Sequence, residues 1–337
     1  MPLYSEQSCA PSVAAPDFLI RHATLRQLQI FEAIVRLGSF TRAAEELFLT
    51  QPTVSMQTKR LSDSIGMPLF EQTGRKLRTT EAGAELYQSC CRIFVNLANL
   101  ESKFAQLKGD CKSRLRIGVI STAKYFVPEV LGKFCRENPS IQVALKMSNR
   151  DQILKRLRSN EDDLYVMGQA PQDQPQVEAI PFAPNPLVVM APRDHYLVGQ
   201  TRIPLARLAE EPFILREPGS GIRDATLQTF DKRQLRPRIH MELDSNEAIK
   251  HAIIGGLGLS VLSLHTLKLE GEKGPLALLD VEDFPIKRNW YLVHPRDREL
   301  SAAAQAFMKF TLATGPGLRR EMETNWPDLK RHLGNGF

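Results

Sequence analysis

Short polar side chains gather at the start of one predicted helix near the N-terminus, where residues 51–61 read QPTVSMQTKRL. Amide, hydroxyl and methyl groups can read base edges in the major groove of DNA, while Lys and Arg suit phosphates. This chemistry makes double-stranded DNA a candidate partner. The candidate base-reading residues are Gln51, Pro52, Thr53, Ser55 and Gln57, and the candidate phosphate-binding residues are Thr41, Arg42, Lys59 and Arg60.

A pair of closely packed helices must position these residues. The apolar spacing predicts a helix over 24–37 that Thr24 can cap. Ser39 can cap a second helix, in which Ala43 and Ala44 face inward. These small residues would let a third helix, capped by Thr50, approach closely. Two helices joined by so short a link form a helix-turn-helix, whose second helix lies in the major groove.

A basic hairpin is predicted to follow. Gly74 offers a turn between two alternating runs, which predicts a two-stranded wing for backbone or minor-groove contacts. Its basic residues are Arg75, Lys76 and Arg78. Residues 21–80 hold nine Lys or Arg against five Asp or Glu, a surplus expected of a nucleic-acid-binding segment. A small helical bundle with a solvated polar face would show the same pattern, so the residues alone leave both interpretations open.

An apolar heptad seam marks the next segment. Its members recur at intervals of four and three residues, which predicts one long helix with a narrow apolar stripe. Such a stripe must be buried, and we expect it to pair two copies of the chain, with core packing inside one chain as the alternative. The seam comprises Leu86, Cys90, Ile93, Leu97, Leu100, Phe104 and Leu107.

From Leu115 onward, predicted strands and helices alternate. Such alternation is typical of α/β domains with parallel sheets. We expect two lobes, with the chain crossing between them near residues 185–188 and 286–289. A last helix is predicted from Ser301 to Thr314, before a GPG sequence.

The segment EPGSGIR at 217–223 could bind an anion. Its glycines allow close backbone approach, Ser220 supplies a hydroxyl and Arg223 a positive charge. Ligands of open α/β sheets bind beyond the carboxyl ends of the strands. The alternative is a plain loop at a helix start.

Composition and cysteine pattern narrow the class of protein. The chain has 337 residues, a net charge of +6 and 42% hydrophobic residues, which is ordinary for a folded protein of several domains. Its five cysteines form no C-x-x-C pair, and no metal-ligating, phosphate-loop or nucleophile motif is present. We therefore expect no catalytic residues, no metal and no cofactor.

The first twenty residues lack the features of a signal peptide, and no stretch reaches the length of a membrane span. We expect a cytoplasmic protein with no membrane partner. A solute-binding protein or an enzyme built on the two lobes is the alternative class. A solute-binding protein for transport would need an export signal and no DNA-binding head.

The motifs GSFTRAAEEL, TQPTVS, LFEQTGR and TTEAG, in this order and spacing, resemble the winged helix-turn-helix of the LysR-type transcriptional regulators. The resemblance continues to about residue 314. It implies an α-rich winged head, a long linker helix and a two-lobed α/β effector domain like the periplasmic binding proteins. The implied boundaries are an extension over 1–21, the head over 22–80, the linker helix over 81–110, the effector domain over 111–314 and a tail over 315–337, with lobe 1 at about 114–187 and 287–314 and lobe 2 at about 188–286.

In that family the effector lies between the lobes. The basic residues near the matching positions suit a carboxylated or phosphorylated metabolite. The implied effector-binding residues are Ser121, Thr122, Lys124, Asn149, Arg150, Gln169, Gly219, Ser220, Arg223, Ser245 and Asn246. Two positions depart from the family pattern: Ile222 stands where a Thr is common, and Tyr165 where a small residue is usual.

The stretches ISTAKYFVP, SNRDQILKRL and MELDSNEAIKHAI look like the LysR subgroup that regulates carbon-dioxide-fixation (RuBisCO) operons. The resemblance implies paired heads that read an inverted repeat in promoter DNA, a dimer or tetramer of the chain, and RNA polymerase as a further partner. A different metabolic operon is the alternative target.

Overall fold

The computed structural model describes residues 23–73, 76–107, 113–171, 174, 176–296 and 299–326. The expected N-terminal extension and the last part of the expected tail lie outside these residues. The chain divides into two compact units, Met1–Leu97 and Ala98–Phe337. Among the described residues, no helix is both long and apolar enough to cross a membrane.

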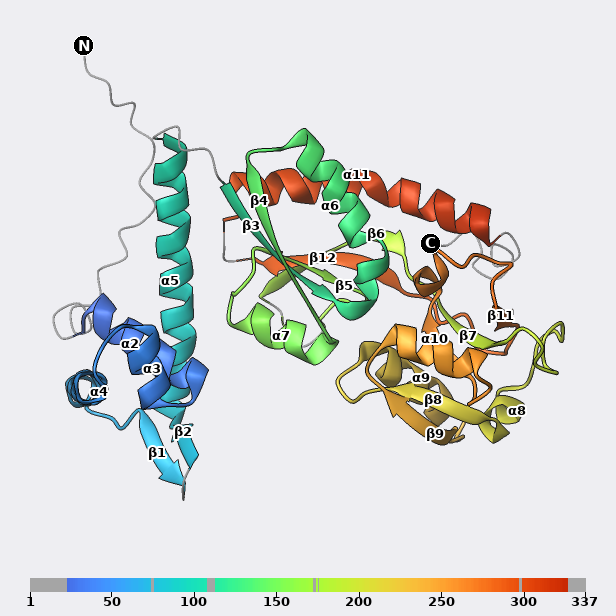
Figure 1. Cartoon of the computed structure of the whole chain (residues 1–337), viewed down its shortest axis with the longest axis horizontal. Coiled ribbons are helices and arrows are strands. Elements are labelled where there is room, and N and C mark those ends of the chain that lie inside the picture. The colour runs from blue at the N-terminus through green and yellow to red at the C-terminus, as the bar shows by residue number, and fades with distance from the viewer. Residues whose placement is uncertain are drawn as a thin grey trace, which may run out of the picture. The chain divides into compact units, whose positions relative to one another are not determined.

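The first unit is a winged helix-turn-helix (Figure 1). Thr24 and Ser39 cap their helices as expected, because each side chain accepts a hydrogen bond from a backbone N–H three residues on. Thr50 also stands at a cap position, but its hydroxyl bonds to that of Thr53 at 2.8 Å and does not cap the helix. The elements are α2 (Leu25–Leu37), α3 (Phe40–Glu46), α4 (Gln51–Ile65), β1 (Phe70–Thr73), β2 (Lys76–Thr79) and the start of α5 (Glu81–Leu107).

The core of this head holds α3 and α4 close together. Ala43 is fully buried, and Val54 and Leu61 of α4 are also fully buried. The inward-facing alanine expected from the sequence is therefore confirmed. The wing is also confirmed, because β1 pairs antiparallel with β2.

Lobe 1 of the second unit is a five-stranded sheet in the order β4-β3-β5-β12-β6. Helices α6 and α11 cover one face and α7 the other (Figure 1). Residues alternate between the faces of β5: Leu164 and Val166 face α6 and α11, whereas Tyr165 and Met167 face α7. The elements are β3 (Ser113–Ile120), the 3₁₀ helix η1 (Ser121–Tyr125), α6 (Val127–Glu137), β4 (Ile141–Ser148), α7 (Arg150–Arg158), β5 (Leu164–Met167), β6 (Val177–Pro184), β12 (Asn289–Pro295) and α11 (Ala302–Asn325).

Lobe 2 contains a three-stranded sheet in the order β10-β7-β11 and a separate pair, β8-β9. The chain enters this lobe after β6 and leaves it before β12. The elements are β7 (Leu187–Pro192), α8 (Leu205–Glu210), β8 (Pro212–Arg216), α9 (Gly221–Lys232), β9 (Arg238–Leu243), α10 (Asn246–Ile254), β10 (Ser260–Ser263), the 3₁₀ helix η2 (Leu264–Leu267) and β11 (Leu276–Leu279).

The expectation of parallel sheets is only partly correct. Strand β3 runs parallel to β4 and β5, and β8 runs parallel to β9. Strand β12 runs antiparallel to β5 and β6, and β7 runs antiparallel to β10 and β11. The cause is the route of the chain: β6 leads out of lobe 1, and β12 returns beside it in the opposite direction.

The predicted end of the last helix at Thr314 is wrong. Helix α11 continues through Pro316 to Asn325. The continuation packs against both lobes, and its last turns bury Met322 and Trp326 in the core of lobe 2. Burial of this apolar surface outweighs the cost of the missing Pro316 N–H.

Candidate functional sites

Helix α4 presents a polar face. Its apolar residues are buried against α2 and α3, so the helical period leaves most of the candidate base- and phosphate-binding residues at the surface. Thr53 and Gln57 are half-buried. The exposed ones are Gln51, Pro52, Ser55, Lys59 and Arg60, together with Thr41 and Arg42 of α3.

Two of the candidate base-reading side chains are held by neighbours. The Gln57 Oε1 atom accepts a hydrogen bond from Gln27 Nε2 at 3.2 Å, and Thr53 bonds to Thr50. The hydrogen bond from Gln27 occupies the amide oxygen of Gln57 and restricts rotation of its side chain. The amide N–H groups of Gln57 can still donate to a base. In the wing, Arg78 is exposed, whereas Arg75 and the side chain of Lys76 lie outside the described residues.

The seam on α5 divides into two parts. Cys90 is fully buried in the head beside Phe31 and Leu61, with Leu86 packed against the same core. Burial raises the pKa of the Cys90 thiol to about 12, so this thiol stays protonated. Further along, Leu97 is half-buried, the side chain of Leu107 lies outside the described residues, and the exposed members are Ile93, Leu100 and Phe104.

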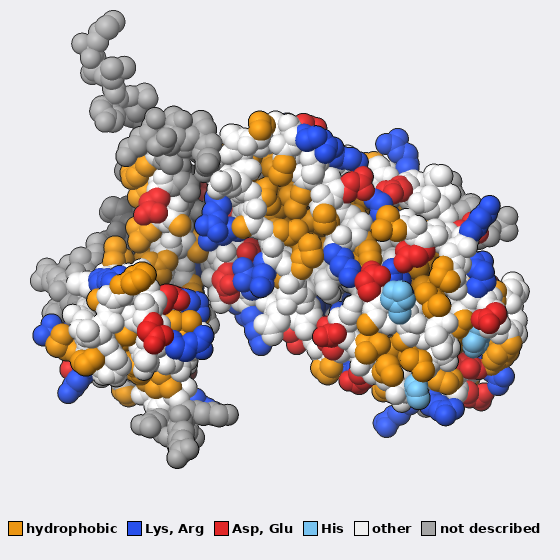
Figure 2. Space-filling model, in the orientation of Figure 1, with side chains coloured by type: hydrophobic (Ala, Val, Ile, Leu, Met, Phe, Trp, Pro, Cys, Tyr) orange, Lys and Arg blue, Asp and Glu red, His pale blue; other side chains and the backbone are white. Residues whose placement is uncertain are grey.

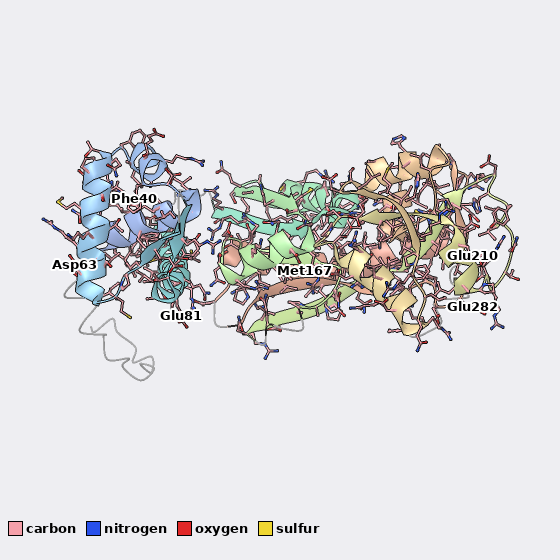
Figure 3. All side chains as sticks on the ribbon, turned by 90° about the horizontal axis from the view of Figure 1, so that it is seen from below. Phe40, Asp63, Glu81, Met167, Glu210 and Glu282 are labelled. Carbon is pink, nitrogen blue, oxygen red and sulfur yellow. The ribbon has the colours of Figure 1, made fainter. Side chains whose placement is uncertain are left out.

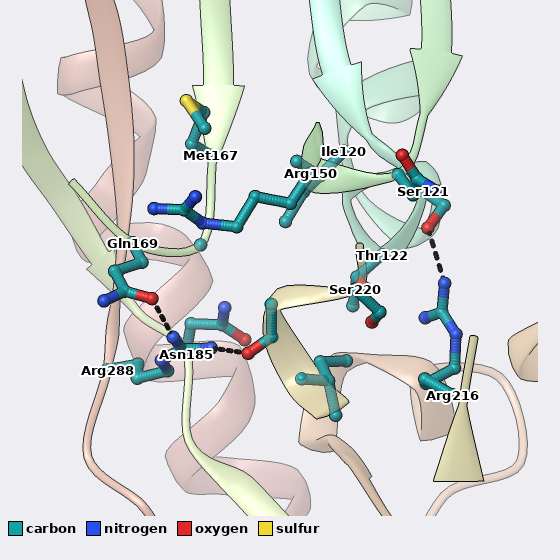
Figure 4. A pocket seen from close by; sticks show the side chains of 14 residues that line it. Ile120, Ser121, Thr122, Arg150, Met167, Gln169, Asn185, Arg216, Ser220 and Arg288 are labelled. Carbon is teal, nitrogen blue, oxygen red and sulfur yellow. Dashed lines mark hydrogen bonds between the residues drawn. The ribbon is translucent and has the colours of Figure 1, made fainter. Parts of the chain in front are cut away.

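A pocket lies between the two lobes of the second unit (Figure 4). Its volume is about 430 Å³ with its open mouth included. The pocket lies beyond the carboxyl ends of β3 and β5 and at the N-terminal ends of α7 and α9. It is lined by Ile120, Ser121, Thr122, Asn149, Arg150, Met167, Gly168, Gln169, Asn185, Arg216, Ser220, Gly221, Ile222 and Arg288.

Six of the eleven effector-binding residues implied by the family resemblance line this pocket. They are Ser121, Thr122, Asn149, Arg150, Gln169 and Ser220. Met167, at the end of β5, is fully buried in the interior of the unit and forms part of the same lining (Figure 3).

Arg223 does not line the pocket. Its guanidinium donates to the carbonyl of Arg216 at 2.8 Å and pairs with Glu242 at 2.7 Å. Its place in the first turn of α9 directs it toward β9. The predicted cation at this position is therefore held by Glu242 and the Arg216 carbonyl outside the lining.

Four other implied residues also lie outside the lining. Ser245 caps α10, and Lys124 pairs with Glu247 at 3.7 Å. The carbonyl of Gly219 accepts a hydrogen bond from the N–H of Asp151, at 3.2 Å. The last of the four, Asn246, is described below with the guanidinium that it contacts.

Arg216 and Arg288 supply the cations that the sequence analysis missed. The side chain of Arg216 is only 2% exposed. Its guanidinium donates to Ser121 Oγ at 3.2 Å and to Asn246 Oδ1, and pairs with Glu217 at 2.7 Å. Asn246 therefore contacts the pocket lining through Arg216 and is not part of the lining itself. The signal in the sequence was an arginine at the end of the buried strand FILR.

Arg288 lies at the crossover back into lobe 1. It donates to the carbonyl of Gly221 at 2.9 Å and to the amide oxygen of Gln169 (Figure 4). Burial, and then the nearby positive charge of Arg150, lower the pKa of Arg288 to about 10. The guanidinium is still charged at neutral pH, so an anion between these groups would relieve their repulsion.

Two glycines leave room in the pocket wall. A Cβ at Gly168 would lie 2.7 Å from the amide nitrogen of Asn185, and one at Gly221 would lie 2.8 Å from Cδ of Arg150. Only glycine allows these side chains to approach so closely. The wall is therefore shaped around polar and cationic groups.

The two departures from the family pattern fall in different places. Ile222 lines the pocket, so an apolar surface replaces the hydroxyl common there. Tyr165 is fully buried on the α7 side of the sheet, where its hydroxyl donates to the carbonyl of Arg156 at 2.9 Å. Gly118 makes room for its ring, since a Cβ there would lie 2.7 Å from Tyr165.

The visible face of the second unit carries Lys, Arg, Asp and Glu side chains interspersed (Figure 2). No single sign of charge dominates that face. The concentration of cations in the pocket is therefore a local feature and does not follow from the net charge of +6.

Two family models match the chain. The model of the bacterial regulatory helix-turn-helix protein, lysR family, matches residues 25–84, and that of the LysR substrate binding domain matches residues 108–316. The chain belongs to the LysR family. The family resemblance drawn from the motifs and the expected winged head and two-lobed effector domain are thereby confirmed.

Several relatives of this LysR regulator cover most of its length. The HTH-type transcriptional activator CmpR of Synechocystis sp. is 49% identical over 294 residues, which are 87% of this chain and 96% of CmpR. The RuBisCO operon transcriptional regulator of Allochromatium vinosum is 48% identical over 292 residues, 87% of this chain and 96% of that protein. The protein is accordingly a LysR-type transcriptional regulator, with a DNA-binding head and a domain for a small-molecule effector.

Two solved structures extend the comparison. The regulatory domain of Synechocystis CcmR in complex with 2-PG is 47% identical and superposes with a TM-score of 0.58, covering 60% of this chain and 97% of that one. Full-length CbnR complexed with its target DNA is 19% identical, with a TM-score of 0.61 over 86% of this chain and 99% of CbnR. The second likeness establishes the fold alone.

Proposed function

We propose that this regulator controls carbon-dioxide-fixation genes in response to a small phosphorylated carboxylate that binds between the lobes. The observation that carries the proposal is the presence of three guanidinium groups, from Arg150, Arg216 and Arg288, in one pocket lining. Arg216 is paired with Glu217, so the positive charge of the other two predominates. Guanidinium groups bind phosphate and carboxylate oxygens in bidentate fashion.

Backbone groups support the same ligand chemistry. Asn149 and Arg150 begin α7, and Ser220 and Gly221 begin α9, and all four residues line the pocket. Helix N-termini present free N–H groups and a partial positive charge, which favour an anion. The related CcmR domain was solved with 2-PG, so 2-phosphoglycolate is the first compound to test.

The head and the linker helix complete the proposed mechanism. Two heads, paired through the exposed part of the α5 seam, read an inverted repeat, and two such dimers form a tetramer. Thr41, Arg42, Lys59, Arg60 and the wing bind phosphates, and the N-terminal turns of α4 read bases. The domains follow the boundaries expected from the sequence, except that the effector domain extends beyond residue 314 to the end of α11. The protein acts in the cytoplasm without enzymatic activity, and it contacts RNA polymerase at the promoter.

Effector binding changes DNA binding only if the ligand binds the closed and open lobes unequally. The lining supports such a difference because it comes from both lobes: Arg150 belongs to lobe 1 and Arg216 to lobe 2. A ligand that bridges them stabilises closure. Closure then alters the spacing of the heads and the bend of the DNA.

The test combines a titration and a genomic selection. Calorimetry of the full-length protein with 2-phosphoglycolate should show binding, and glycolate without the phosphate should bind far more weakly. Genomic DNA retained by the protein should be enriched in one inverted repeat beside a carboxylase operon. Enrichment beside an unrelated operon would replace the proposed target, and equal affinity for glycolate would remove the phosphate from the ligand class.

A further inference from the structure

Helix α11 is anchored in both lobes. At its N-terminal end, Ala304 and Phe307 are buried in the core of lobe 1, where the Phe307 ring lies 5.1 Å from that of Phe134. At its C-terminal end, Met322 and Trp326 are buried in the core of lobe 2. Between Ala304 and Met322 the helix spans about 27 Å. It is a third connection between the lobes, in addition to the two crossovers of the chain.

The irregular point of α11 lies beside one crossover. Gly315 packs so closely on β6 that a Cβ there would lie 1.9 Å from the carbonyl oxygen of Phe182. Strand β6 ends two residues later, at Pro184, where the chain leaves lobe 1. Pro316 follows Gly315 and removes a helical N–H, which is a usual cause of helix bending. The sequence Gly-Pro-Gly therefore places a bendable point at the boundary of the lobes.

A lysine of lobe 2 reinforces this connection. Lys268 Nζ lies 3.2 Å from Glu321 of α11 and also pairs with Glu129 of α6. Lys268 is the C-cap residue of η2 in lobe 2, Glu321 belongs to α11 and Glu129 belongs to α6 of lobe 1. They join lobe 2 to the helical layer of lobe 1 at a distance from the pocket lining.

Hydrogen bonds cross the cleft between the lobes in this structure. Tyr125 of lobe 1 donates to Glu247 of lobe 2 at 2.6 Å, and the N–H of Asp151 donates to the carbonyl of Gly219 at 3.2 Å. The structure that forms these hydrogen bonds also buries Met322 and Trp326 in lobe 2. Opening the lobes must bend α11 near Gly315 or withdraw its last turn from lobe 2.

We propose that Met322 and Trp326 are positioning residues, which stabilise lobe closure through α11 and so raise effector affinity without touching the effector. The effect on affinity rests on the proposed function, while the effect on closure does not. A coupling between two sites of this kind commonly changes an equilibrium by roughly 5- to 150-fold.

The N–H of Asp151 reports closure without any ligand. Asp151 is the second residue of α7, so its N–H has no partner within the helix. Its acceptor is Gly219, which belongs to the other lobe. Amide hydrogen exchange at Asp151 therefore follows opening of the cleft, and exchange in β3, an interior strand of the lobe 1 sheet, follows global unfolding.

Exchange at Asp151 should rise at least about fivefold in Trp326→Ala and Met322→Ala of the full-length protein, with β3 unchanged. Trp326→Phe should restore most of the protection because it keeps an aromatic ring in the same core. Arg320→Ala, on the exposed side of α11, should behave as wild type. Folded alanine variants with unchanged exchange at Asp151 would overturn the proposal; if Trp326→Ala fails to fold, Met322→Ala and Trp326→Phe decide.

Calorimetry with 2-phosphoglycolate then separates the two proposals. Where wild type binds, Trp326→Ala should raise Kd by at least about fivefold. Where wild type shows no binding, the ligand assignment fails and the exchange result alone decides the role of α11. An unchanged Kd beside faster exchange at Asp151 would overturn the link between α11 and affinity.

Discussion

The buried guanidinium of Arg288 lies close enough to Arg150 for the positive charge of Arg150 to lower its pKa. Both groups line the same pocket. The two residues are far apart in the sequence and meet because α7 begins where the chain returns from lobe 2. Two like charges held together in a partly buried site are costly unless an anion separates them. Their proximity therefore makes this pocket favourable for an anion.

Arg288→Gln should weaken binding of 2-phosphoglycolate by roughly 10- to 150-fold, the range expected for loss of one charged hydrogen-bonding group. Binding to operator DNA without effector should stay unchanged, because the head is untouched. Calorimetry and a DNA-binding titration measure the two effects. Arg238→Gln, an exposed cation on β9, is the matched control and should leave both values as in wild type. Equal affinities in the two variants would exclude Arg288 from the ligand site.

Ser55→Ala should reduce the preference for the operator over random DNA by about 1 kcal/mol, since an exposed hydroxyl on α4 can bond a base edge. Lys59→Ala should instead weaken binding to all sequences and lower the slope of log K against log salt by about 1. The two substitutions lie one turn apart on the same helix and serve as controls for each other. Identical effects on specificity and salt dependence would show that the assigned roles are wrong.

Phe104→Glu should weaken self-association of the chain. The Phe104 side chain is 51% exposed and Leu100 is 46% exposed, so neither contributes fully to the core of its own chain. A buried carboxylate in a helix pair is unfavourable. Sedimentation equilibrium of the full-length protein measures the change. Glu101→Gln, a neutralisation beside the seam, is the control. A Phe104→Glu protein that associates as wild type does would mean that the seam is not the dimer contact.

His265 should make stability depend on pH. Burial lowers the pKa of its imidazole, which packs against Phe126 and Trp290 and binds the carbonyl of Pro184 at 2.9 Å. As pH falls through the unfolded value of about 6.5, the unfolded chain takes up the proton first. The free energy of unfolding contributed by neutral His265 is therefore present above that value and declines below it.

Urea unfolding between about pH 7.5 and 5.5 tests this expectation, with His265→Gln as the comparison. Glutamine can donate to the Pro184 carbonyl but does not titrate in this range. The variant should be less stable than wild type at the higher pH and should lose less stability on acidification. Parallel curves for the two proteins would assign the pH dependence to other groups.

Much of the head was predictable because its determinants are local. Thr24 and Ser39 cap helices through residues three positions away, and Ala43 is inward by the helical period. The motifs of the head were also sufficient to identify the family. Thr50 shows where such local prediction fails. It was expected to cap its helix, but its hydroxyl bonds to that of Thr53.

The effector pocket was only partly predictable. Polar residues that directly follow strands, such as Ser121 and Asn149, were implied by the family resemblance. They line the pocket because the carboxyl ends of parallel strands meet at one edge. Arg223 was chosen by its neighbours in the sequence, yet the phase of α9 turns it toward Glu242. The direction of a helical side chain depends on where its helix starts, and one residue more or less rotates it by about 100°.

The sequence by itself determined the family, the order of the elements and the polar face of α4, and it predicted an anionic ligand. These depend on neighbours along the chain, on periodicity and on residue type. Only the tertiary structure decided that Arg216 and Arg288 line the pocket, that Cys90 belongs to the head, and that α11 passes Pro316 to bury Trp326 in lobe 2. Each of these outcomes depends on burial against residues distant in the sequence, and the free energy of such burial exceeds local preference.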